Sequence, residues 1–486
     1  MTPVQGVFTV QQVRAAEATL MSRLPYGTLM RRAAFGLAVH ARRLLSHTTG
    51  AHVTLLVGAG DNGGDALWAG VELLRRGAGV RAVLLRPDRA HPEGLAALRR
   101  AGGRVCDIDA AHAAVTTADL VVDGIVGISG RGGLRPPADR LVATATDAGV
   151  PILAVDLPSG VDPDTGAVEG AAVNAAETVA FGALKPVHVL AAPRCGRVHL
   201  VDIGLSPYLP APHAHVLEAA DVAVRWPLPG PTDDKYTQGV KGVAAGSDSY
   251  PGAAVLATGA AVLATSGMVR YAGSAAPGVR DHWVEVITSR TVEEAGRTQA
   301  WAVGPGIGTD EAGRAVLAAT IATDVPLVID ADGITLLARH DDLRTAIRGR
   351  PALITPHAGE FARIAGEVGV DRIAATRRAA AALDVSVLLK GNTTVVADPD
   401  GRTLVHPSPG SWAATAGSGD VLTGMIGALL AAGLAPWWAA GCAAYVHARA
   451  AAIAARGAPA PASRLQAAIP DALRSLEADR ATERPA

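Results

Sequence analysis

Residues 52–67 of the chain read HVTLLVGAGDNGGDAL, an apolar run with strand character, then a glycine-rich turn, then the start of a helical pattern. The glycines satisfy the GxGxxG spacing in the strand-to-helix context in which that motif binds a dinucleotide. However, Asp61 and Asp65 flank these glycines, and their charge opposes a pyrophosphate at the N-terminus of a helix. The stretch therefore predicts a parallel α/β fold whose site suits hydroxyl groups or a hard cation better.

The same alternation of strand and helix patterns continues on both sides of this stretch. Apolar runs alternate with helical patterns up to about residue 220, and a second series begins near residue 240. Such alternation predicts βαβ units and mostly parallel sheets. Between the series lies VRWPLPGPTDDKYTQG, which is rich in Pro, Gly and Asp and predicts a linker. We expect an α/β chain with a Rossmann-like three-layer domain over 1–220, a linker over 221–238, and a three-layer α/β/α domain over 239–480.

The composition excludes several classes of partner. The 486-residue chain has a formal net charge of −1 and a pI near 6.9, so no basic surface indicates binding to nucleic acid or anionic lipid. Its three cysteines, Cys106, Cys195 and Cys442, are far apart, which argues against a disulfide framework and favours a reducing compartment. Residues 1–20 lack the basic and apolar regions of a signal peptide. We therefore expect a cytoplasmic protein with small-molecule substrates.

One uncharged run raises the question of a membrane span. No Asp, Glu, Lys or Arg occurs from Val421 to Ala448, a length that could cross a bilayer about 30 Å thick. Gly433-Leu434-Ala435-Pro436 interrupts the run, and a proline there ends the first helical segment. The pattern therefore predicts two packed helices within a domain and no contact with a membrane.

Two more acids stand at the ends of predicted strands in the first half. Asp123 ends DLVVD and Asp156 ends PILAVD. In an open parallel sheet the ligand crevice lies outside these carboxyl ends, so both acids should lie near Asp61 and Asp65. Each acid alone is also compatible with a helix cap, but together they predict a polar binding site.

The stretches DNGGD, DGIVGISG and DLPSG resemble, in this order, the three signatures of the NAD(P)H-hydrate epimerase domain, over roughly residues 10–215. The resemblance implies an isomerase that interconverts the R and S epimers of hydrated NADH and NADPH (NADHX and NADPHX) and that binds K+. It assigns the cation to Asn62, Asp123 and Ser159. It assigns the substrate to Asp61, Asn62, Gly63, Gly64, Asp65, Gly127, Ile128, Ser129, Gly130, Arg131, Gly132, Gly133 and Asp156. The chain departs from the family pattern at Asp61, usually Asn, at Ala66, usually Gly, and in VGIS, usually FGTG.

The epimerisation itself requires acid–base chemistry. The C6–O bond of the hydrate must break and form again, through an iminium that the ring nitrogen stabilises, and an acid must assist the departing hydroxide. Asp156 is our candidate catalytic residue. Lys185, in FGALKP, is one of few lysines in the chain, and we expect it at the surface of a strand end.

The second half carries glycine-rich and polar turns after its predicted strands. GPGIG (304–308) permits close approach of the backbone to a ligand, and VIDADG (328–333) ends a strand with two acids. TPHAGE (355–360) offers His357 as a ligand contact or a plain loop histidine. VLLKGNTTVV (387–396) predicts strand, turn and strand, in which a lysine, backbone N–H groups and hydroxyls suit a phosphate; a polar hairpin turn without a ligand is the alternative.

The stretch ATAGSGDVLTG (414–424) predicts a helix start with one acid, Asp420. Small residues leave the first N–H groups of the helix free for a phosphoryl group, which the helix dipole also favours. Asp420 can then take a proton from a substrate hydroxyl that attacks phosphorus. The alternative is that Asp420 is only a helix N-cap.

These motifs resemble, in order and over roughly residues 235–475, the ADP-dependent NAD(P)H-hydrate dehydratase of the ribokinase-like superfamily, with AGSGD in place of GGTGD. The resemblance implies a lyase that dehydrates (S)-NADHX and (S)-NADPHX, converts ADP to AMP and phosphate, and uses Mg2+. It implies that Asp420 is the catalytic residue. It assigns binding of the hydrate to Ala253, Gly306, His357 and Asp420. It assigns the nucleotide to Lys390, Gly391, Asn392, Thr393, Thr394 and Gly419. We also expect a homo-oligomer.

A rival interpretation keeps the fold and changes the function. The second half would be a ribokinase-like kinase for a vitamin or sugar, and the first half a non-catalytic nucleotide-binding module whose acids only hold a cation. Release of inorganic phosphate with return of the NAD(P)H absorbance separates the two, because a kinase leaves a stable phosphoester.

Overall fold

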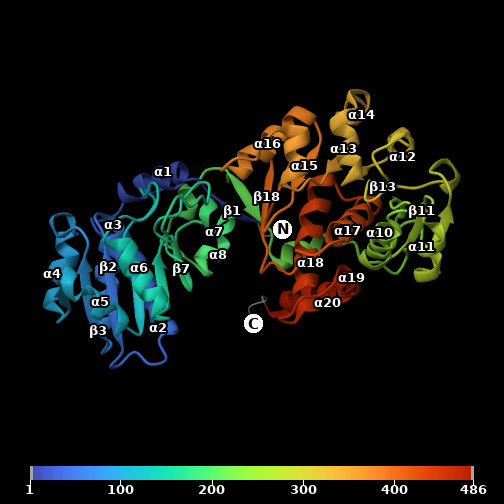
Figure 1. Cartoon of the computed structure of the whole chain (residues 1–486). Coiled ribbons are helices and arrows are strands. Elements are labelled where there is room, and N and C mark those ends of the chain that lie inside the picture. The colour runs from blue at the N-terminus through green and yellow to red at the C-terminus, as the bar shows by residue number, and fades with distance from the viewer. Residues whose placement is uncertain (1–3, 483–486) are drawn as a thin grey trace. The chain divides into compact units, whose positions relative to one another are not determined.

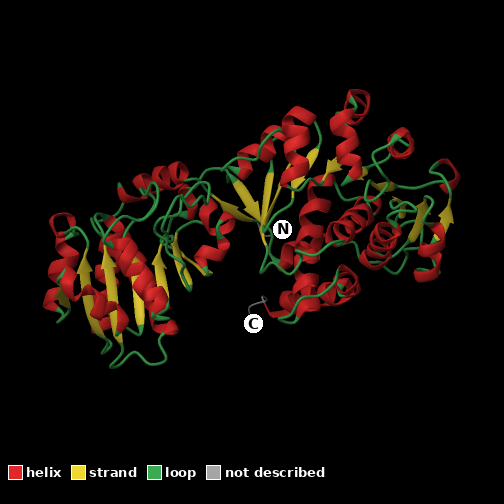
Figure 2. Cartoon of the chain, viewed as in Figure 1, coloured by secondary structure: helices red, strands yellow, loops and turns green. Residues whose placement is uncertain are grey.

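The computed structural model describes residues 4–482 of the chain, which form two compact units. One unit comprises Gly6–His213, and the other begins at Ala214 and also includes Val4 and Gln5. Each unit has its own sheet and its own cores of buried side chains (Figures 1 and 2). The prediction of an α/β chain with mostly parallel sheets is confirmed. The division between the units, however, falls after residue 213 and not at 220.

The N-terminal unit contains a seven-stranded sheet of order β4-β3-β2-β5-β6-β7-β8, in which every pair is parallel. One core lies between the sheet and α1–α4, and another between the opposite face and α5 and α6, which gives the expected three layers. The strands are β2 (His52–Val57), β3 (Gly79–Leu84), β4 (Arg104–Cys106), β5 (Leu120–Gly124), β6 (Ile152–Val155), β7 (Glu177–Phe181) and β8 (Arg197–Val201). The helices are α1 (Val10–Met21), α2 (Thr28–Leu44), α3 (Asp61–Leu74), α4 (Pro92–Arg100), α5 (Ile108–Thr116), α6 (Ala138–Asp147), α7 (Pro186–Leu190) and α8 (Ala192–Cys195); β1 (Gln5–Val7) precedes them.

The strand order fixes where this unit binds a ligand. The chain runs from β2 outward to β3 and β4 and then crosses to β5, on the other side of β2. Ligands of open α/β sheets bind at such a reversal of strand order, beyond the carboxyl ends of the strands. The two turns that follow β2 and β5 approach closely, because a Cβ at Gly58 would lie 1.7 Å from the carbonyl oxygen of Ile125. Glycine at 58 is therefore a requirement of this crossing.

The C-terminal unit contains a sheet of order β1-β9-β18-β17-β16-β15-β14-β13-β10-β11-β12. From β9 to β12, only the pairs β16–β17 and β17–β18 are antiparallel, so VLLKGNTTVV forms the expected strand, turn and strand. The strands are β9 (Ala214–Val216), β10 (Val240–Ala244), β11 (Met268–Ala272), β12 (Ile287–Ser289), β13 (Ala300–Val303), β14 (Leu327–Ile329), β15 (Ala352–Ile354), β16 (Ser386–Leu389), β17 (Thr393–Ala397) and β18 (Thr403–Pro407).

Helices cover both faces of this second sheet, as expected for an α/β/α domain (Figure 1). One face packs against α9 (Ala219–Arg225), α10 (Pro251–Ala264), α17 (Ser418–Ala431), α18 (Pro436–Ala455), α19 (Ala462–Ala467) and α20 (Ile469–Thr482). The other face packs against α12 (Glu311–Ala322), α13 (Asp332–Arg339), α14 (Asp341–Ile347), α15 (Ala358–Ala365) and α16 (Arg372–Leu383). Helix α11 (Ala276–His282) packs with α10 against the strands β10 and β11.

The uncharged run forms two buried helices, α17 and α18, in the core of this unit. Helix α17 lies directly against α10, since a Cβ at Gly424 would come 2.0 Å from the carbonyl oxygen of Ala257. Small residues are thus required where the two helix backbones meet. Across residues 4–482, no helix combines the length and apolar character that a membrane crossing needs.

The predicted linker is largely part of the C-terminal unit. Residues 219–225 form α9. The next residue, Trp226, is only 5% exposed, and its indole Nε1 donates a hydrogen bond to the carbonyl oxygen of Ala264 at 2.9 Å, which holds this segment to the unit. The exposed stretch is limited to about residues 228–237, and it joins two elements of one unit. A proline-rich sequence signals irregular backbone, but it does not show which side chains the unit buries.

This packing predicts a large effect of Trp226→Ala. Loss of the buried indole should destabilise the C-terminal unit by about 3–5 kcal/mol, measured by denaturant unfolding. The matched control is Leu228→Ala, because Leu228 is 56% exposed in the same segment and a surface change is worth at most about 0.5 kcal/mol. Equal stability of the two variants would contradict the anchoring role of Trp226.

Candidate functional site

The N-terminal unit contains a cavity of about 530 Å³ at the reversal of strand order. Its walls come from the turn after β2, the start of α3, the loop after β5, the end of β6, and the segment that joins α1 to α2. Asp61, Asn62, Asp65 and Asp156 line it as the sequence predicts. The carboxyl ends of separate strands therefore meet at one site, as the topology requires.

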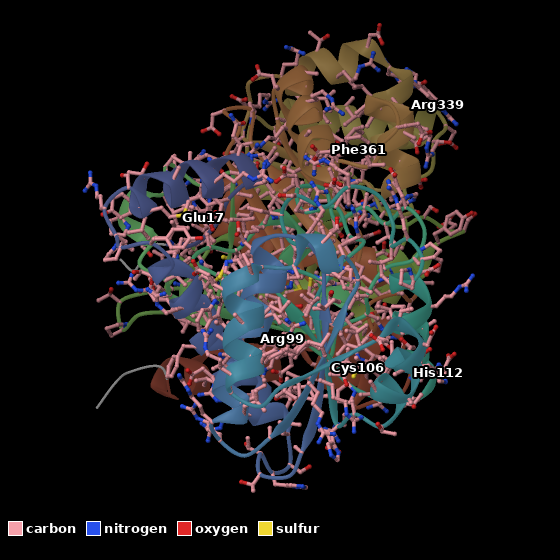
Figure 3. The ribbon with its side chains drawn as sticks, turned by 90° about the vertical axis from the view of Figure 1, so that its left-hand side faces the viewer. Glu17, Arg99, Cys106, His112, Arg339 and Phe361 are labelled. Atoms are coloured by element: carbon pink, nitrogen blue, oxygen red, sulfur yellow. The ribbon has the colours of Figure 1, made fainter. Side chains whose placement is uncertain are left out.

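Acidic side chains crowd this cavity. Asp65 is buried, and burial, followed by the charges of Asp156, Asp61 and Glu17, raises its pKa well above the usual value. Burial also raises the pKa of Glu17, an acid on α1 labelled in Figure 3, although the nearby Lys185 opposes this shift. Burial and mutual repulsion thus favour the protonated form of Asp65.

Asp156 is held by a buried ion pair. Its Oδ1 lies 2.8 Å from Nζ of Lys185 and accepts a hydrogen bond from the backbone N–H of Phe181. The backbone of Asp156 is in the left-handed region, with φ of 64°, which is uncommon for a residue other than glycine. Lys185 is only 1% exposed. The expectation that this lysine lies at the surface is therefore wrong, because the turn after β7 directs it inward to a carboxylate.

His188 fixes the backbone around that ion pair. Burial, and then the charge of Lys185, lowers its pKa to about 4, so its imidazole is neutral at pH 7. Its Nδ1 accepts a hydrogen bond from the backbone N–H of Lys185 at 2.9 Å, and its Nε2 lies 2.7 Å from the carbonyl oxygen of Asp156. A neutral ring with its proton on Nε2 satisfies both contacts.

The predicted cation ligands Asp123 and Ser159 are in direct contact. Ser159 Oγ donates to Asp123 Oδ1 at 2.7 Å, and the Ser159 N–H donates to Oδ2 at 2.9 Å. Burial raises the pKa of Asp123 to about 6, and the hydrogen bonds from Ser159 counter part of the shift. Asn62 lies against Gly127, where a Cβ would come 3.1 Å from Asn62 Oδ1, and its Nδ2 is buried without a hydrogen-bond partner.

The structure brings only part of the predicted substrate loop to the cavity. Gly127, Ile128 and Ser129 line it, and Arg14 of α1 donates a hydrogen bond to Ser129 Oγ at 2.7 Å. The cavity walls do not include Gly130, Arg131, Gly132 and Gly133. The same holds for Gly63 and Gly64, which instead allow close packing at the start of α3.

In the C-terminal unit, Asp420 lies in the first turn of α17 but does not cap it. The N-cap is Gly417, with φ of 85°, and no side chain donates or accepts a cap hydrogen bond there. Burial, then the charge of Asp330, raises the pKa of Asp420 to about 7, although Lys390 opposes this. The acid is thus poised to exchange a proton near neutral pH.

Lys390 faces Asp420 across a small polar cluster. Its Nζ lies 2.7 Å from Oδ1 of Asp330 and 3.8 Å from Oε2 of Glu360. Burial disfavours its charge, but Asp330 and Glu360 outweigh burial and raise its pKa. A Cβ at Gly419 would come 3.5 Å from Lys390 Nζ. The cation therefore lies next to the N-terminal end of α17, where the helix dipole would also stabilise an anionic group.

The remaining predicted residues of this unit fall into three groups. Ala253 and Gly306 are neighbours, because a Cβ at Gly306 would lie 3.1 Å from Ala253 Cβ. His357 caps α15 through its Nδ1, and its ring is 56% exposed beside Glu360. Asn392 lies in the turn after β16, where its carbonyl oxygen accepts a hydrogen bond from the Ser408 N–H, and Thr393, the first residue of β17, is buried.

Sequence reasoning missed several residues of both clusters. Asp330 and Glu360 stand in quoted motifs but were not assigned to the site, although Asp330 also accepts a hydrogen bond from Thr423 Oγ1 at 2.7 Å. Their position at strand ends beside Lys390 was the available signal. Glu17 has no such signal, since only the folding of α1 over the cavity brings it there.

Two family models match the chain. The model described as "NAD(P)H-hydrate dehydratase" matches residues 241–471, and the model described as "YjeF-related protein N-terminus" matches residues 27–187. Each match thus falls within one of the two units and includes most of the site residues described above.

Curated relatives match both halves at once. The bifunctional NAD(P)H-hydrate repair enzyme Nnr of Mycobacterium tuberculosis (strain CDC 1551 / Oshkosh) is 59% identical over 434 residues, which cover 88% of this chain and 89% of that protein. The Mycobacterium leprae (strain TN) protein of the same name is 56% identical over 479 residues, which cover 96% of this chain and 99% of that protein. A crystal structure of the ADP/ATP-dependent NAD(P)H-hydrate dehydratase from Bacillus subtilis, co-crystallised with ATP/Mg2+, is 27% identical and covers 53% of this chain and 97% of its own, with a TM-score of 0.47.

The identity to these relatives extends over nearly their whole length and over both sheets, with the acidic cavity in one unit and the Asp420–Lys390 cluster in the other. The chain belongs to the family of bifunctional NAD(P)H-hydrate repair enzymes.

Proposed function

We propose that the N-terminal unit interconverts the R and S epimers of NADHX and NADPHX, and that the C-terminal unit dehydrates the S epimer while ADP becomes AMP and phosphate. Asp420 is the observation that carries the proposal, because this partly buried acid, whose pKa is raised to about 7, lies in the first turn of a helix near a lysine. The pairing of an acid with an anion site suits phosphoryl transfer to a hydroxyl group.

The dehydration proceeds in two steps. In the first step, the oxygen of the C6 hydroxyl attacks the β-phosphorus of ADP while Asp420 takes the proton of that hydroxyl, and AMP leaves. The ring nitrogen then expels phosphate from C6, and loss of a proton from C5 restores the dihydropyridine. Lys390 and the N–H groups of α17 stabilise the transferring phosphoryl group. We assign the nucleotide phosphates to Lys390, Gly391, Asn392, Thr393, Thr394 and Gly419, and the hydrate to Ala253, Gly306 and His357 with Asp420.

Mg2+ would accompany the nucleotide at this cluster. Asp330, Glu360 and Asp420 offer carboxylate oxygens near Lys390, and such oxygens suit Mg2+. The ion would neutralise phosphate charge.

The epimerisation uses two carboxyl groups of the cavity. Asp65, whose pKa is raised by burial and by the neighbouring acids, donates a proton to the departing hydroxide, while Asp156, ion-paired with Lys185, accepts the proton of the water that returns to the other face. The substrate would lie in the 530 Å³ cavity against Asp61, Asn62 and the Gly127–Ser129 turn.

K+ would bind at Asn62, Asp123 and Ser159. Carboxylate, amide and hydroxyl oxygens suit a hard cation, and within residues 4–482 no cationic side chain forms an ion pair with the buried Asp123. The cation would offset the burial of that carboxylate and hold the turn after β5 against the cavity.

This assignment predicts a cation dependence of one activity. Asp123→Asn should raise the K+ concentration needed for half-maximal epimerisation at least about 10-fold, because the ion loses its charged ligand. Dehydration of purified (S)-NADHX by the same protein should match the wild-type rate at every K+ concentration, because it takes place in the other unit. Unchanged K+ activation of epimerisation in the variant would contradict the assignment.

The cytoplasm is the compartment we propose, because NADH and NADPH form there and Cys106, Cys195 and Cys442 are free thiols. A homo-oligomer is our expectation for the assembly, which light scattering measures directly.

The decisive assay mixes the full chain with the R and S epimers of NADHX and with ADP. We expect both epimers to disappear, the NADH absorbance to return, and AMP and inorganic phosphate to form in equal amounts. A phosphorylated product that retains its phosphate would instead support the vitamin or sugar kinase.

A further inference from the structure

Three metal-ligating side chains meet outside the cavity, at the edge of the N-terminal sheet. His40 lies on α2, Glu177 begins β7, and His199 lies in the middle of β8. One ligand atom from each lies within 4.8 Å of the other two. None of the three side chains lines the 530 Å³ cavity, so the cluster is separate from the epimerase site.

The contacts within this cluster leave one nitrogen without a partner. His199 Nε2 lies 2.9 Å from Glu177 Oε2, and the His40 ring stacks on the His199 ring with centroids 4.2 Å apart. Nδ1 of His40 is buried and has no hydrogen-bond partner. A buried polar atom without a hydrogen-bond partner is unfavourable for the fold, and an ion bound at Nδ1 would supply that partner.

The three side chains are ligand types that a divalent metal ion accepts. Neutral imidazole is the form that ligates metals. Glu177 supplies the negative charge that a divalent cation requires.

We propose that His40, Glu177 and His199 bind a divalent first-row metal ion, with Zn2+ as the best match. Two imidazoles and one carboxylate with an open fourth position form a known type of zinc coordination, and Zn–N bonds are about 2.0–2.1 Å long. Side-chain rotations must therefore bring the three ligand atoms to bonding distance of one common point. Binding replaces the His199–Glu177 hydrogen bond, and the Nε2 proton of a neutral His199 moves to Nδ1.

Such an ion would tie α2 to the last two strands of the sheet. The first turns of α2 include Thr28, Leu29 and Met30, which line the epimerase cavity. The metal would thus act as a structural clamp between the helix that closes the cavity and the sheet beneath it.

The test is a Co2+ titration of the full-length, tag-free, metal-stripped protein, because tetrahedral Co2+ has a visible absorption that Zn2+ lacks. We expect one equivalent of Co2+ per chain, displaced by Zn2+. His199→Ala and Glu177→Gln should each weaken Co2+ binding at least about 10-fold. The matched control is His112→Ala, since His112 is an exposed histidine of the same unit (Figure 3).

Thermal unfolding followed by circular dichroism checks that the N-terminal unit of each variant is folded. If His199→Ala does not fold, Glu177→Gln, which keeps the side-chain size, provides the test. The proposal is overturned if the wild-type protein shows no tetrahedral Co2+ band, or if the two cluster variants bind Co2+ as tightly as His112→Ala does.

Discussion

Replacing Asp420 with Asn is expected to lower the rate of NADHX dehydration at least about 100-fold, because loss of a general base typically costs 10²–10⁴ in rate. Asparagine keeps the shape of the side chain and loses the proton acceptor. The melting temperature should not fall, since Asp420 makes no cap hydrogen bond and burial already disfavours its charged form. Epimerisation, which belongs to the other unit, should be unaffected.

The pH profile of dehydration provides a second measurement of the same residue. A general base must be ionised to work, so the rate should rise with pH through about 7, the pKa of Asp420. In the Asp420→Asn variant the residual rate should not show this rise with pH. The control is Asp471→Asn, because Asp471 is an exposed acid in the first turn of α20. Near-wild-type dehydration by Asp420→Asn would show that another residue is the base.

Replacing Asp156 with Asn is the second change with a large expected effect. We expect epimerisation to fall by about 10²–10⁴, so that the protein consumes (S)-NADHX at the wild-type rate but (R)-NADHX only as fast as it epimerises without catalysis. Asparagine tolerates the left-handed backbone at this position, with φ of 64°. The measurement is the time course of each epimer with excess ADP.

The control for this variant is Asp109→Asn, since Asp109 is an exposed acid in the first turn of α5. Lys185→Met adds a structural comparison: it leaves a buried carboxylate unpaired and should destabilise the N-terminal unit by about 3–5 kcal/mol. If Asp156→Asn clears both epimers at equal rates, Asp156 has no catalytic role and only positions Lys185.

Much of the site could be predicted because its residues lie at strand ends. Asp61, Asp123, Asp156 and Lys390 each follow or end an apolar run, and parallel strands bring such positions to one edge of a sheet. Asp420 was recognisable for a different reason, as the single acid at the start of an uncharged helix. Lys185 shows the limit of this reasoning, since a lysine after a strand is compatible with both solvent and a buried carboxylate.

The sequence by itself determined the α/β class, the two sheets, and the glycine-rich turns, because period, turn residues and strand-end acids are local properties of the chain. The tertiary structure alone decided which acids share a cavity, which carboxylate Lys185 neutralises, and that α9 and Trp226 belong to the C-terminal unit. It also brought His40 to Glu177 and His199 from elements more than a hundred residues apart. Burial and charge–charge contact depend on distances in space, and no local pattern encodes them.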